Sequence, residues 1–487
     1  MSASPRQTIP KLTAGKGKVL AGLVSVLALA ACASVPDLGA APQPKTAAAY
    51  ESSKSLAAPA AAWPADDWWT AYGDSQLDAL IAEALKGSPD LRVAQARLAK
   101  AAALQSVARA SLLPSLTGQA QVADVKTSYN NGIPPAFTPH GLNGAGLVGL
   151  NFNYEIDFWG KNRSALAAAA SETRAAQAEA AEARLALSTG IAGVYADLAR
   201  LYAERDVAEE TLRVRQDTLT LVSDRVANGA DTRAELMQAQ AGAPTAREQL
   251  AGVDEDIALA RNRIAALMGE GPDRALDIQR PAAASLKPFG LPPTLAADLI
   301  GRRPDVAAAR WRAEAAAKRI GVAKAQFYPN VNLAAVAGYQ SLGLSKLFMS
   351  GSDEGQAGAA LTLPIFEGGR LSANLKGARS DYDEAVASYD GVVARAFEQT
   401  ADAAASERAL GLRLSEAQAA LAANREAYSV ASLRYRGGLS NYQSVLLAED
   451  AMLLSRRTVA DLQARAFALD VQLVQALGGG FSASRAG

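Results

Sequence analysis

This chain of 487 residues is poor in the residue types that build most catalytic and metal sites. It has one cysteine, Cys32, and one histidine, His140. The single cysteine excludes an intramolecular disulfide, and His140 lies in a segment rich in glycine and proline without a catalytic or metal-binding partner near it. No metal-spaced cluster, nucleophile elbow or phosphate-binding glycine loop occurs. We therefore expect no enzymatic activity, no cofactor and no metal.

The chain also lacks an excess of charge and a long hydrophobic run. Lys plus Arg and Asp plus Glu number 49 each, so no global field attracts nucleic acid. The apolar run from Val19 to Ala30 is too short for a helix across ~30 Å of hydrocarbon. No later stretch is long enough either, so a membrane helix is not expected.

The beginning of the chain has the pattern of a secretory signal. Basic residues precede the apolar run, and Leu29-Ala30-Ala31 precedes Cys32. This arrangement resembles the bacterial lipobox, in which the cysteine is diacylated and becomes the mature N-terminus. We predict a signal peptide over 1–31 and a lipid-anchored, Ala/Pro-rich linker over 32–62. The alternative is a plain signal peptide with an incidental cysteine.

Proline is absent from residues 161–226 and 370–436, and each stretch would span about 100 Å as one helix. Heptad-like apolar spacing places a seam along these helices and their successors. The predicted helices are 88–113, 161–226, 232–268, 304–327, 370–436 and 440–477. On helices alone, a soluble coiled-coil rod remains an alternative.

The sequence contains an internal repeat. Pro89 and Pro304 are separated by the same number of residues as Pro114 and Pro329, with similar Ala-rich segments between each pair of prolines. We expect a first structural repeat over 63–272, including an N-terminal segment, and a second over 303–480. A connector, 273–302, lies between them, and a C-terminal tail, 481–487, follows.

Four strands are predicted at about 116–126, 147–158, 331–340 and 357–365. In the second, Phe152, Tyr154 and Ile156 alternate with Asn153 and Glu155, which gives one apolar and one polar face. Segments of this kind are typical of outer-membrane strands, with the apolar residues toward lipid; an ordinary half-buried sheet is the alternative. Four strands cannot close a barrel and open edges are not tolerated in lipid, so several protomers would have to pool them.

Several motifs, in this order and spacing, resemble the TolC-like outer-membrane efflux proteins, in the lipoprotein (NodT-type) branch serving resistance-nodulation-division pumps. They are Asp67-Trp68-Trp69, Arg302-Arg303-Pro304-Asp305, Phe366-Glu367-Gly368-Gly369-Arg370 and Tyr435-Arg436-Gly437. The resemblance implies an α+β membrane protein, a homotrimeric 12-stranded β-barrel continuous with a long α-helical periplasmic barrel. It further implies an outer-membrane exit duct for small toxic compounds, with a periplasmic adaptor, an inner-membrane pump and outer-membrane lipid as partners. A duct for a secreted polypeptide and a lipid-anchored scaffold without a pore are the alternatives.

The resemblance also implies a gate at the helical tips. Arg434, Tyr435 and Arg436 fall on the positions of the tyrosine–arginine latch; alternatively, the cations only complement the helix C-terminus. The turns expected to contact the adaptor contain Asn228, Gly229, Asp231, Thr232, Gly437, Gly438, Ser440 and Asn441, with Ser440 and either Asp231 or Thr232 predicted as helix caps.

The sequence departs from the family beyond the latch. Leu447 stands where pump-type relatives carry a constricting aspartate, and Gln443 replaces the apolar residue before it. Glu449 and Asp450 follow, but each residue turns a helix by ~100°, so the sequence leaves open whether an acidic ring faces the lumen. Weaker block by multivalent cations than in relatives is therefore expected.

Overall fold

The computed structural model describes residues 34–130, 132–286 and 289–483, so the predicted signal peptide and Cys32 lie outside the described residues. The chain divides into two compact units. The first comprises the described residues up to Pro42, Ala101–Thr173 and Arg312–Val386, and the second comprises Gln43–Lys100, Arg174–Trp311 and Ala387 onward. Each unit therefore takes matching segments from both halves of the sequence repeat, and neither repeat forms a compact unit of its own.

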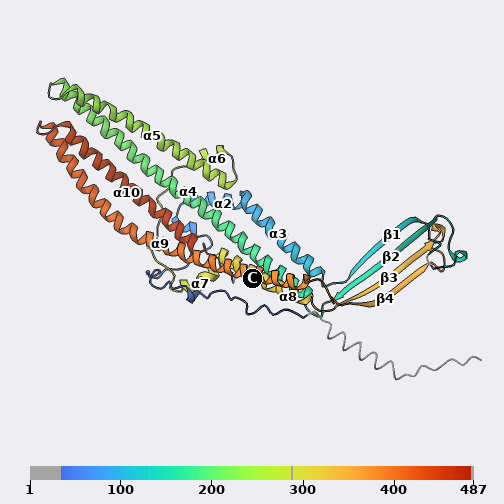
Figure 1. Cartoon of the computed structure of the whole chain (residues 1–487). Coiled ribbons are helices and arrows are strands. Elements are labelled where there is room, and N and C mark those ends of the chain that lie inside the picture. The colour runs from blue at the N-terminus through green and yellow to red at the C-terminus, as the bar shows by residue number, and fades with distance from the viewer. Residues whose placement is uncertain (1–33, 131, 287–288, 484–487) are drawn as a thin grey trace, which may run out of the picture. The chain divides into compact units, whose positions relative to one another are not determined.

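The first unit contains one antiparallel sheet. Its strands are β1 (Ser115–Val125), β2 (Asn143–Ile156), β3 (Asn330–Leu342) and β4 (Asp353–Thr362), in the order β1-β2-β3-β4 (Figure 1). The sheet thus consists of two hairpins side by side, β1–β2 and β3–β4, and both hairpin loops lie at one end of the sheet. At the other end each strand continues toward a helix. Within the described chain, β1 and β4 each pair with a single neighbour.

The pairing register sorts the side chains of the sheet into two faces. Phe152 lies opposite Leu116 and Ala335, whereas Asn153 lies opposite Ser115 and Ala334. Because successive side chains alternate, these pairs define an apolar and a polar face across all four strands. The apolar face carries Leu116, Val122, Val148, Leu150, Phe152, Tyr154, Ile156, Val331, Leu333, Tyr339 and Leu361. The polar face carries Ser115, Thr117, Gln119, Gln121, Asn151, Asn153, Glu155, Asn332, Gln340, Glu354 and Gln356, together with the apolar Val125, Leu147, Val336 and Leu342.

Two strands end earlier than predicted. β4 stops at Thr362, so Leu363 and Ile365 are not strand residues as expected; Pro364 has no N–H to donate to a ladder. β2 stops at Ile156 rather than at 158, because the Asp157 carboxylate leaves the sheet to accept the backbone N–H of Asn162 at 3.2 Å. Both strands begin four residues earlier than predicted, where the loops are rich in glycine.

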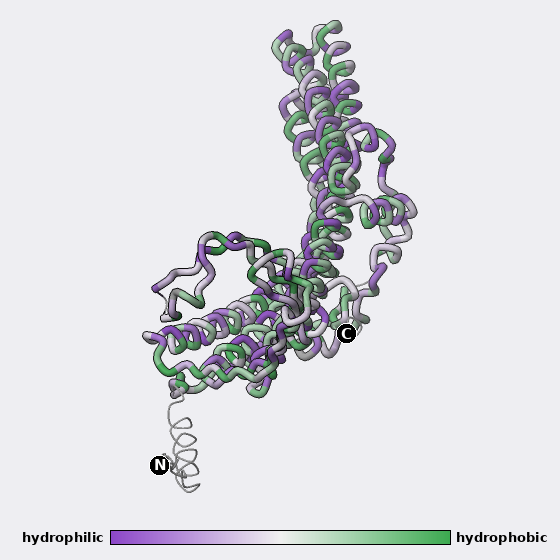
Figure 2. Tube along the Cα trace, turned by 90° about the vertical axis from the view of Figure 1, so that its right-hand side faces the viewer, coloured by the Kyte–Doolittle hydropathy of each residue, from purple (hydrophilic) through white to green (hydrophobic). Residues whose placement is uncertain are grey.

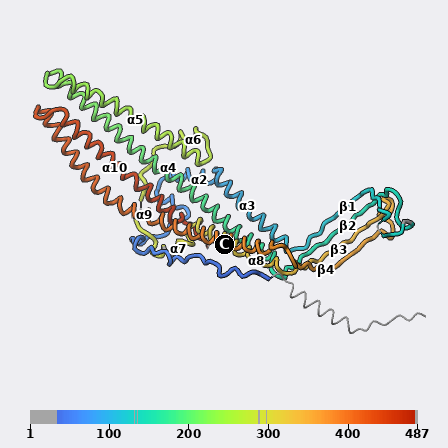
Figure 3. Tube along the Cα trace, in the orientation of Figure 1, coloured from blue at the N-terminus to red at the C-terminus, as the bar shows by residue number. Residues whose placement is uncertain are grey.

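The helices form the rest of the fold. α3 (Pro89–Ala110) leads to β1, α8 (Pro304–Ala325) leads to β3, and the two longest helices, α4 (Lys161–Ala227) and α9 (Arg370–Arg436), contribute residues to both units. In the second unit the return helices α5 (Arg233–Met268) and α10 (Tyr442–Ala476) follow α4 and α9, which gives two antiparallel hairpins (Figure 3).

Hydrophilic and hydrophobic residues alternate along these helices (Figure 2). Among the described residues, no helix combines the length and apolarity needed to cross a membrane.

Further short elements of the second unit were not predicted from the sequence. They are η2 (Trp68–Tyr72), α2 (Ser75–Gly87), α6 (Pro272–Leu276) and α7 (Leu295–Arg302). Asp74 caps α2, and its carboxylate also accepts the hydroxyl of Tyr195 on α4 at 2.7 Å. Leu77 and Ile81 are fully buried in the core that surrounds this contact. The N-terminal segment of the first repeat therefore packs against the middle of α4.

The segment predicted as a linker packs on helices where it is described. In the second unit, the backbone N–H of Lys45 donates to Asp390 on α9 at 2.9 Å, and Tyr50 stacks on Phe397 with ring centroids 5.3 Å apart. In the first unit, Arg379 on α9 donates to the carbonyl oxygens of Gly39, at 3.3 Å, and Ala40. These contacts hold the segment along α9 as an ordered strap.

Candidate functional site at the helical tips

Two tight turns close the helical hairpins of the second unit. The turn between α4 and α5 contains Gly229 at φ 71°, and the turn between α9 and α10 contains Gly438 at φ 74°. Both values lie in the left-handed region that glycine tolerates without strain, so each long helix can end there.

Each return helix then begins with a capping residue. Thr232 caps α5, and its backbone N–H donates to the Glu235 carboxylate at 2.7 Å. Asn441, not the predicted Ser440, caps α10 by accepting the Ser444 N–H at 3.1 Å.

Three side chains connect the two hairpins at their tips, and we call Arg225, Asp231 and Tyr435 the tip latch. Tyr435 on α9 donates its hydroxyl to Asp231 in the α4–α5 turn. Arg225 on α4 donates to Asp231 at 2.8 Å and to the Tyr435 carbonyl oxygen at 2.7 Å. Its guanidinium also lies 4.3 Å from the centre of the Tyr435 ring, within the range of a cation–π contact. The tip latch thus joins one hairpin to the other within a single chain.

The charge states of the tip latch favour its contacts at neutral pH. Burial and the neighbouring Asp231 carboxylate raise the pKa of Tyr435, whose side chain is fully buried, so its hydroxyl keeps the proton that it donates. Burial alone would raise the pKa of Asp231, but the hydrogen bonds that Asp231 accepts from Arg225 and Tyr435 lower it below its usual value. Asp231 therefore stays ionised and Arg225 stays charged.

The sequence identified only part of this cluster. Tyr435 and Asp231 were both singled out, but their contact was not predicted, and Arg225 was missed because it belongs to no repeat or family motif. Arg434 and Arg436 are exposed, and within the described part of the chain neither makes an ion pair. The structure thus brings Tyr435 into a contact between hairpins and leaves its two arginine neighbours at the surface.

A second polar cluster connects the hairpins ten residues before Arg225 on α4, about 15 Å along the helix. Arg215 on α4 forms ion pairs with Glu449, at 2.8 Å, and with Asp450 on α10. Thr218 donates its hydroxyl to the other Glu449 oxygen at 2.7 Å. We call Arg215, Thr218, Glu449 and Asp450 the inter-hairpin cluster.

Burial determines what Glu449 can do. Its side chain is fully buried, and burial raises its pKa, although Thr218 and Arg215 act in the opposite direction. Leu447 is 62% exposed and Gln443 is exposed as well, whereas Glu449 faces Arg215. In this arrangement the Glu449 carboxylate connects two helices and presents no free charge at the surface.

The comparisons with known proteins agree with this geometry. The model of the family described as "Outer membrane efflux protein" matches residues 80–270 and 295–479. The Fusaric acid resistance protein FusA of Burkholderia cepacia is 38% identical over 75% of this chain and 70% of its own length. The multidrug resistance outer membrane protein MdtQ of Escherichia coli O157:H7 is 31% identical over 94% of this chain and 96% of its own.

Solved structures share the fold. The outer membrane protein VceC from Vibrio cholerae has a TM-score of 0.82 and 45% identity, with 86% of this chain and all 100% of the VceC chain covered. The CmeC outer membrane channel of Campylobacter jejuni has a TM-score of 0.83 and 25% identity over 93% of this chain and 96% of its own.

The amphipathic four-stranded sheet and the two long helical hairpins are thus the α+β fold of an outer-membrane channel protein. The chain belongs to the outer membrane efflux protein family. Its predicted fold class and its predicted role as an outer-membrane efflux channel are confirmed at this level.

Proposed function

We propose that this chain is one protomer of a homotrimeric exit duct, in which three four-stranded sheets close a 12-stranded barrel in the outer membrane. The observation that carries the proposal is the sheet itself: one face is apolar, the other is rich in amides and hydroxyls, and among the described residues β1 and β4 each pair along one edge only. In hydrocarbon these edges need partners. Pairing β1 of one copy with β4 of the next supplies them around a closed ring.

The duct would serve a tripartite efflux system for small toxic compounds. The relatives named as multidrug or fusaric acid resistance proteins support this class of cargo. A periplasmic adaptor would contact the exposed turns at the tips, and an inner-membrane resistance-nodulation-division pump would supply the cargo. The tip latch would hold the tips together, with Leu447 and Gln443 on the exposed side of α10 in place of an acidic ring.

The mass and single-channel conductance of the detergent-purified protein test this proposal. We expect a particle of three chains that conducts ions after reconstitution into planar bilayers. A monomer that inserts without conductance would support a lipid-anchored scaffold and contradict the duct. Co-purification of a translocating polypeptide would instead favour the secretion alternative.

We further propose that Cys32 is acylated and tethers the chain to the inner leaflet of the outer membrane. The lipobox-like Leu29-Ala30-Ala31 before the single cysteine supports it. Two acyl chains anchor a protein stably, whereas one is marginal.

Radiolabelled palmitate should therefore enter the native protein and not Cys32→Ser. The variant should still fold, because the strands hold the assembly in the membrane. Equal labelling of both proteins would contradict acylation at Cys32.

A further inference from the structure

A hollow of about 700 Å³ lies in the first unit where the sheet meets the helices. We call it the junction hollow. It is formed by three connections, β2 to α4, α8 to β3 and β4 to α9, and it is similar in size to sites for drug-sized ligands. Its walls include Trp159, Lys161, Tyr328, Phe366, Arg370 and Leu371.

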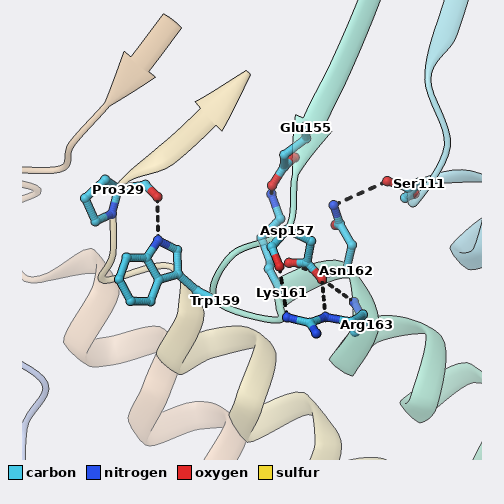
Figure 4. A network of polar contacts seen from close by, with 8 residues as sticks. All are labelled: Ser111, Glu155, Asp157, Trp159, Lys161, Asn162, Arg163 and Pro329. Carbon is cyan, nitrogen blue, oxygen red and sulfur yellow. Dashed lines mark hydrogen bonds and ion pairs between the residues drawn. The ribbon is translucent and has the colours of Figure 1, made fainter. Parts of the chain in front are cut away.

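A network of polar contacts shapes the wall that leads from β2 to α4 (Figure 4). The Asp157 carboxylate accepts the backbone N–H groups of Asn162, at 3.2 Å, and Arg163, at 2.8 Å. The Trp159 indole N–H donates to the Pro329 carbonyl oxygen at 2.8 Å, and its ring stacks on Tyr328 at 4.6 Å. These contacts fix an aromatic wall without help from a ligand.

In the single chain the rim of the hollow is apolar and exposed. Phe366 is 89% exposed and Ile365 is 73% exposed, and Trp159 is about half exposed. Contiguous exposed apolar side chains of this kind mark a surface that contacts another apolar group.

The charges at the hollow are already neutralised. Lys161 lies 2.5 Å from Glu155, and Arg370 lies 2.8 Å from Glu367, so each cation has an acidic partner. A phosphate group would therefore compete with an existing ion pair. An apolar ligand meets no such competition.

Two hydrogen-bond acceptors in the wall lack a donor. The side-chain oxygens of Gln326 and Asn330 are buried and have no hydrogen-bond partner among the described residues. These two atoms have no exposed surface, so a ligand in the hollow does not reach them and they do not select its chemistry. The aromatic wall and the apolar rim therefore determine the ligand suited to the hollow, which is apolar.

The N-terminal strap leads toward this hollow. Tyr382 donates to the carbonyl oxygen of Pro42 at 3.1 Å, and one turn earlier on α9 Arg379 holds Gly39 and Ala40. Val35 and Leu38 then pack against the cluster of Ala323, Phe327, Leu371 and Leu375. Residue numbers therefore rise together along the strap and α9, so the strap runs parallel to α9. Toward its N-terminal end it approaches Leu371, which is itself part of the hollow.

The strap meets the hollow where the described chain begins. The first described residue is Ser34, directly before Val35, and Cys32 precedes Ser34 by two positions in the sequence.

We propose that the junction hollow is the binding site for an acyl chain attached to Cys32 of the same chain. The aromatic wall and the exposed rim contact this acyl chain. This inference rests on the acylation of Cys32 proposed above. The lipid thereby stabilises the junction between strands and helices in addition to tethering the protein.

The test uses the full-length protein in its native membrane. Cells are fed a palmitate analogue that carries a photoactivatable diazirine, the membranes are irradiated, and the cross-linked peptides are mapped by mass spectrometry. We expect cross-links within one chain, in the peptides that contain residues 155–161, 326–330 and 362–371.

Two substitutions provide a matched pair. Phe366→Glu places a charge on the rim at an exposed side chain and should lower the cross-link yield about tenfold, equivalent to ~1.4 kcal/mol. Phe348→Glu alters a side chain that is 72% exposed in the distant β3–β4 loop and should leave the yield unchanged. The cross-link map of the unaltered protein decides the question even if Phe366→Glu fails to assemble.

The outcomes separate this inference from the proposal on which it rests. Label on Cys32 with cross-links only to bulk lipid, to the apolar strand face or to a neighbouring protomer would overturn the site and leave acylation intact. Failure of the analogue to attach to Cys32, when palmitate also fails, would overturn both.

Discussion

Phe152→Arg is expected to destabilise the assembled protein by about 2–4 kcal/mol, the cost of an arginine on the lipid face near the midplane of an outer-membrane strand. Phe152 lies between Leu116 and Ala335 on the apolar face of the sheet. In the assembled barrel that we propose, this face contacts hydrocarbon. The guanidinium would have to leave water without gaining an acidic partner from the neighbouring strands.

Asn153→Arg is the matched control. It lies one position along the same strand, between Ser115 and Ala334 on the polar face, so its side chain would extend into the aqueous lumen. Both variants are compared with the unaltered protein by two measurements: the yield of trimer and the urea concentration at the midpoint of folding into lipid vesicles. Equal losses, or a larger loss for Asn153→Arg, would contradict a lipid boundary at Phe152, Tyr154 and Ile156.

The strands and helices were predictable where one period dominates the sequence. Strict alternation around Phe152 identified β2, and α9 has the same bounds as the predicted helix, 370–436, because proline is absent within it and glycine follows it. Such patterns depend only on local geometry, which a sequence displays directly.

The element ends and the contacts between hairpins were not predictable in the same way. Ser440 and Asn441 are both good caps, and only the path of the turn decides that Asn441 accepts the Ser444 N–H. Arg225 and Tyr435 are separated by more than two hundred residues, and no periodicity relates them. Their contact depends on how two hairpins pack, which is a tertiary property.

The family motif around Arg303 has a structural explanation that the sequence alone did not supply. Arg303 is buried, donates to Asp305 at 2.7 Å and donates to the carbonyl oxygen of Ala476 at 3.0 Å. It therefore joins the beginning of α8 to the last residue of α10. The motif identified the family correctly, and the structure shows that its Arg303 has a structural role in linking two helix ends.

Substitutions in the two clusters are expected to act differently: loss of a tip-latch contact mainly opens the channel, whereas loss of an inter-hairpin contact mainly lowers the stability of the protein. Tyr435→Phe removes only the hydroxyl that reaches Asp231. A hydrogen bond to a charged group contributes about 1.5–3 kcal/mol, so the loss shifts a two-state closure roughly tenfold or more toward open tips in each protomer. We expect a higher single-channel conductance with little change in thermal stability.

Arg215→Ala acts on a buried pair instead. It leaves the fully buried Glu449 without its cation, and removing one partner of a buried ion pair costs about 3–5 kcal/mol. We therefore expect a clear loss of thermal stability and only a small change in single-channel conductance. Glu449→Gln in the same chain should restore part of the loss, because the amide needs no counterion.

Arg436→Ser is the control for the tip latch, since its side chain is exposed while Tyr435 beside it is buried. It should leave conductance near that of the unaltered protein, and the double variant with Tyr435→Phe should match Tyr435→Phe alone. If Arg436→Ser opens the channel and Tyr435→Phe does not, the gate lies in contacts between protomers.

The pH dependence of the conductance provides a further check on the tip latch. The pKa of Asp231 is lower in the folded protein than the ordinary value near 3.9, so its stabilisation is present above that value and is lost as the pH falls through the lower folded pKa. The latch should therefore stay closed from neutral pH to about pH 5. An opening transition within that range, abolished by Asp231→Asn, would show that Asp231 binds its proton more readily than this geometry allows.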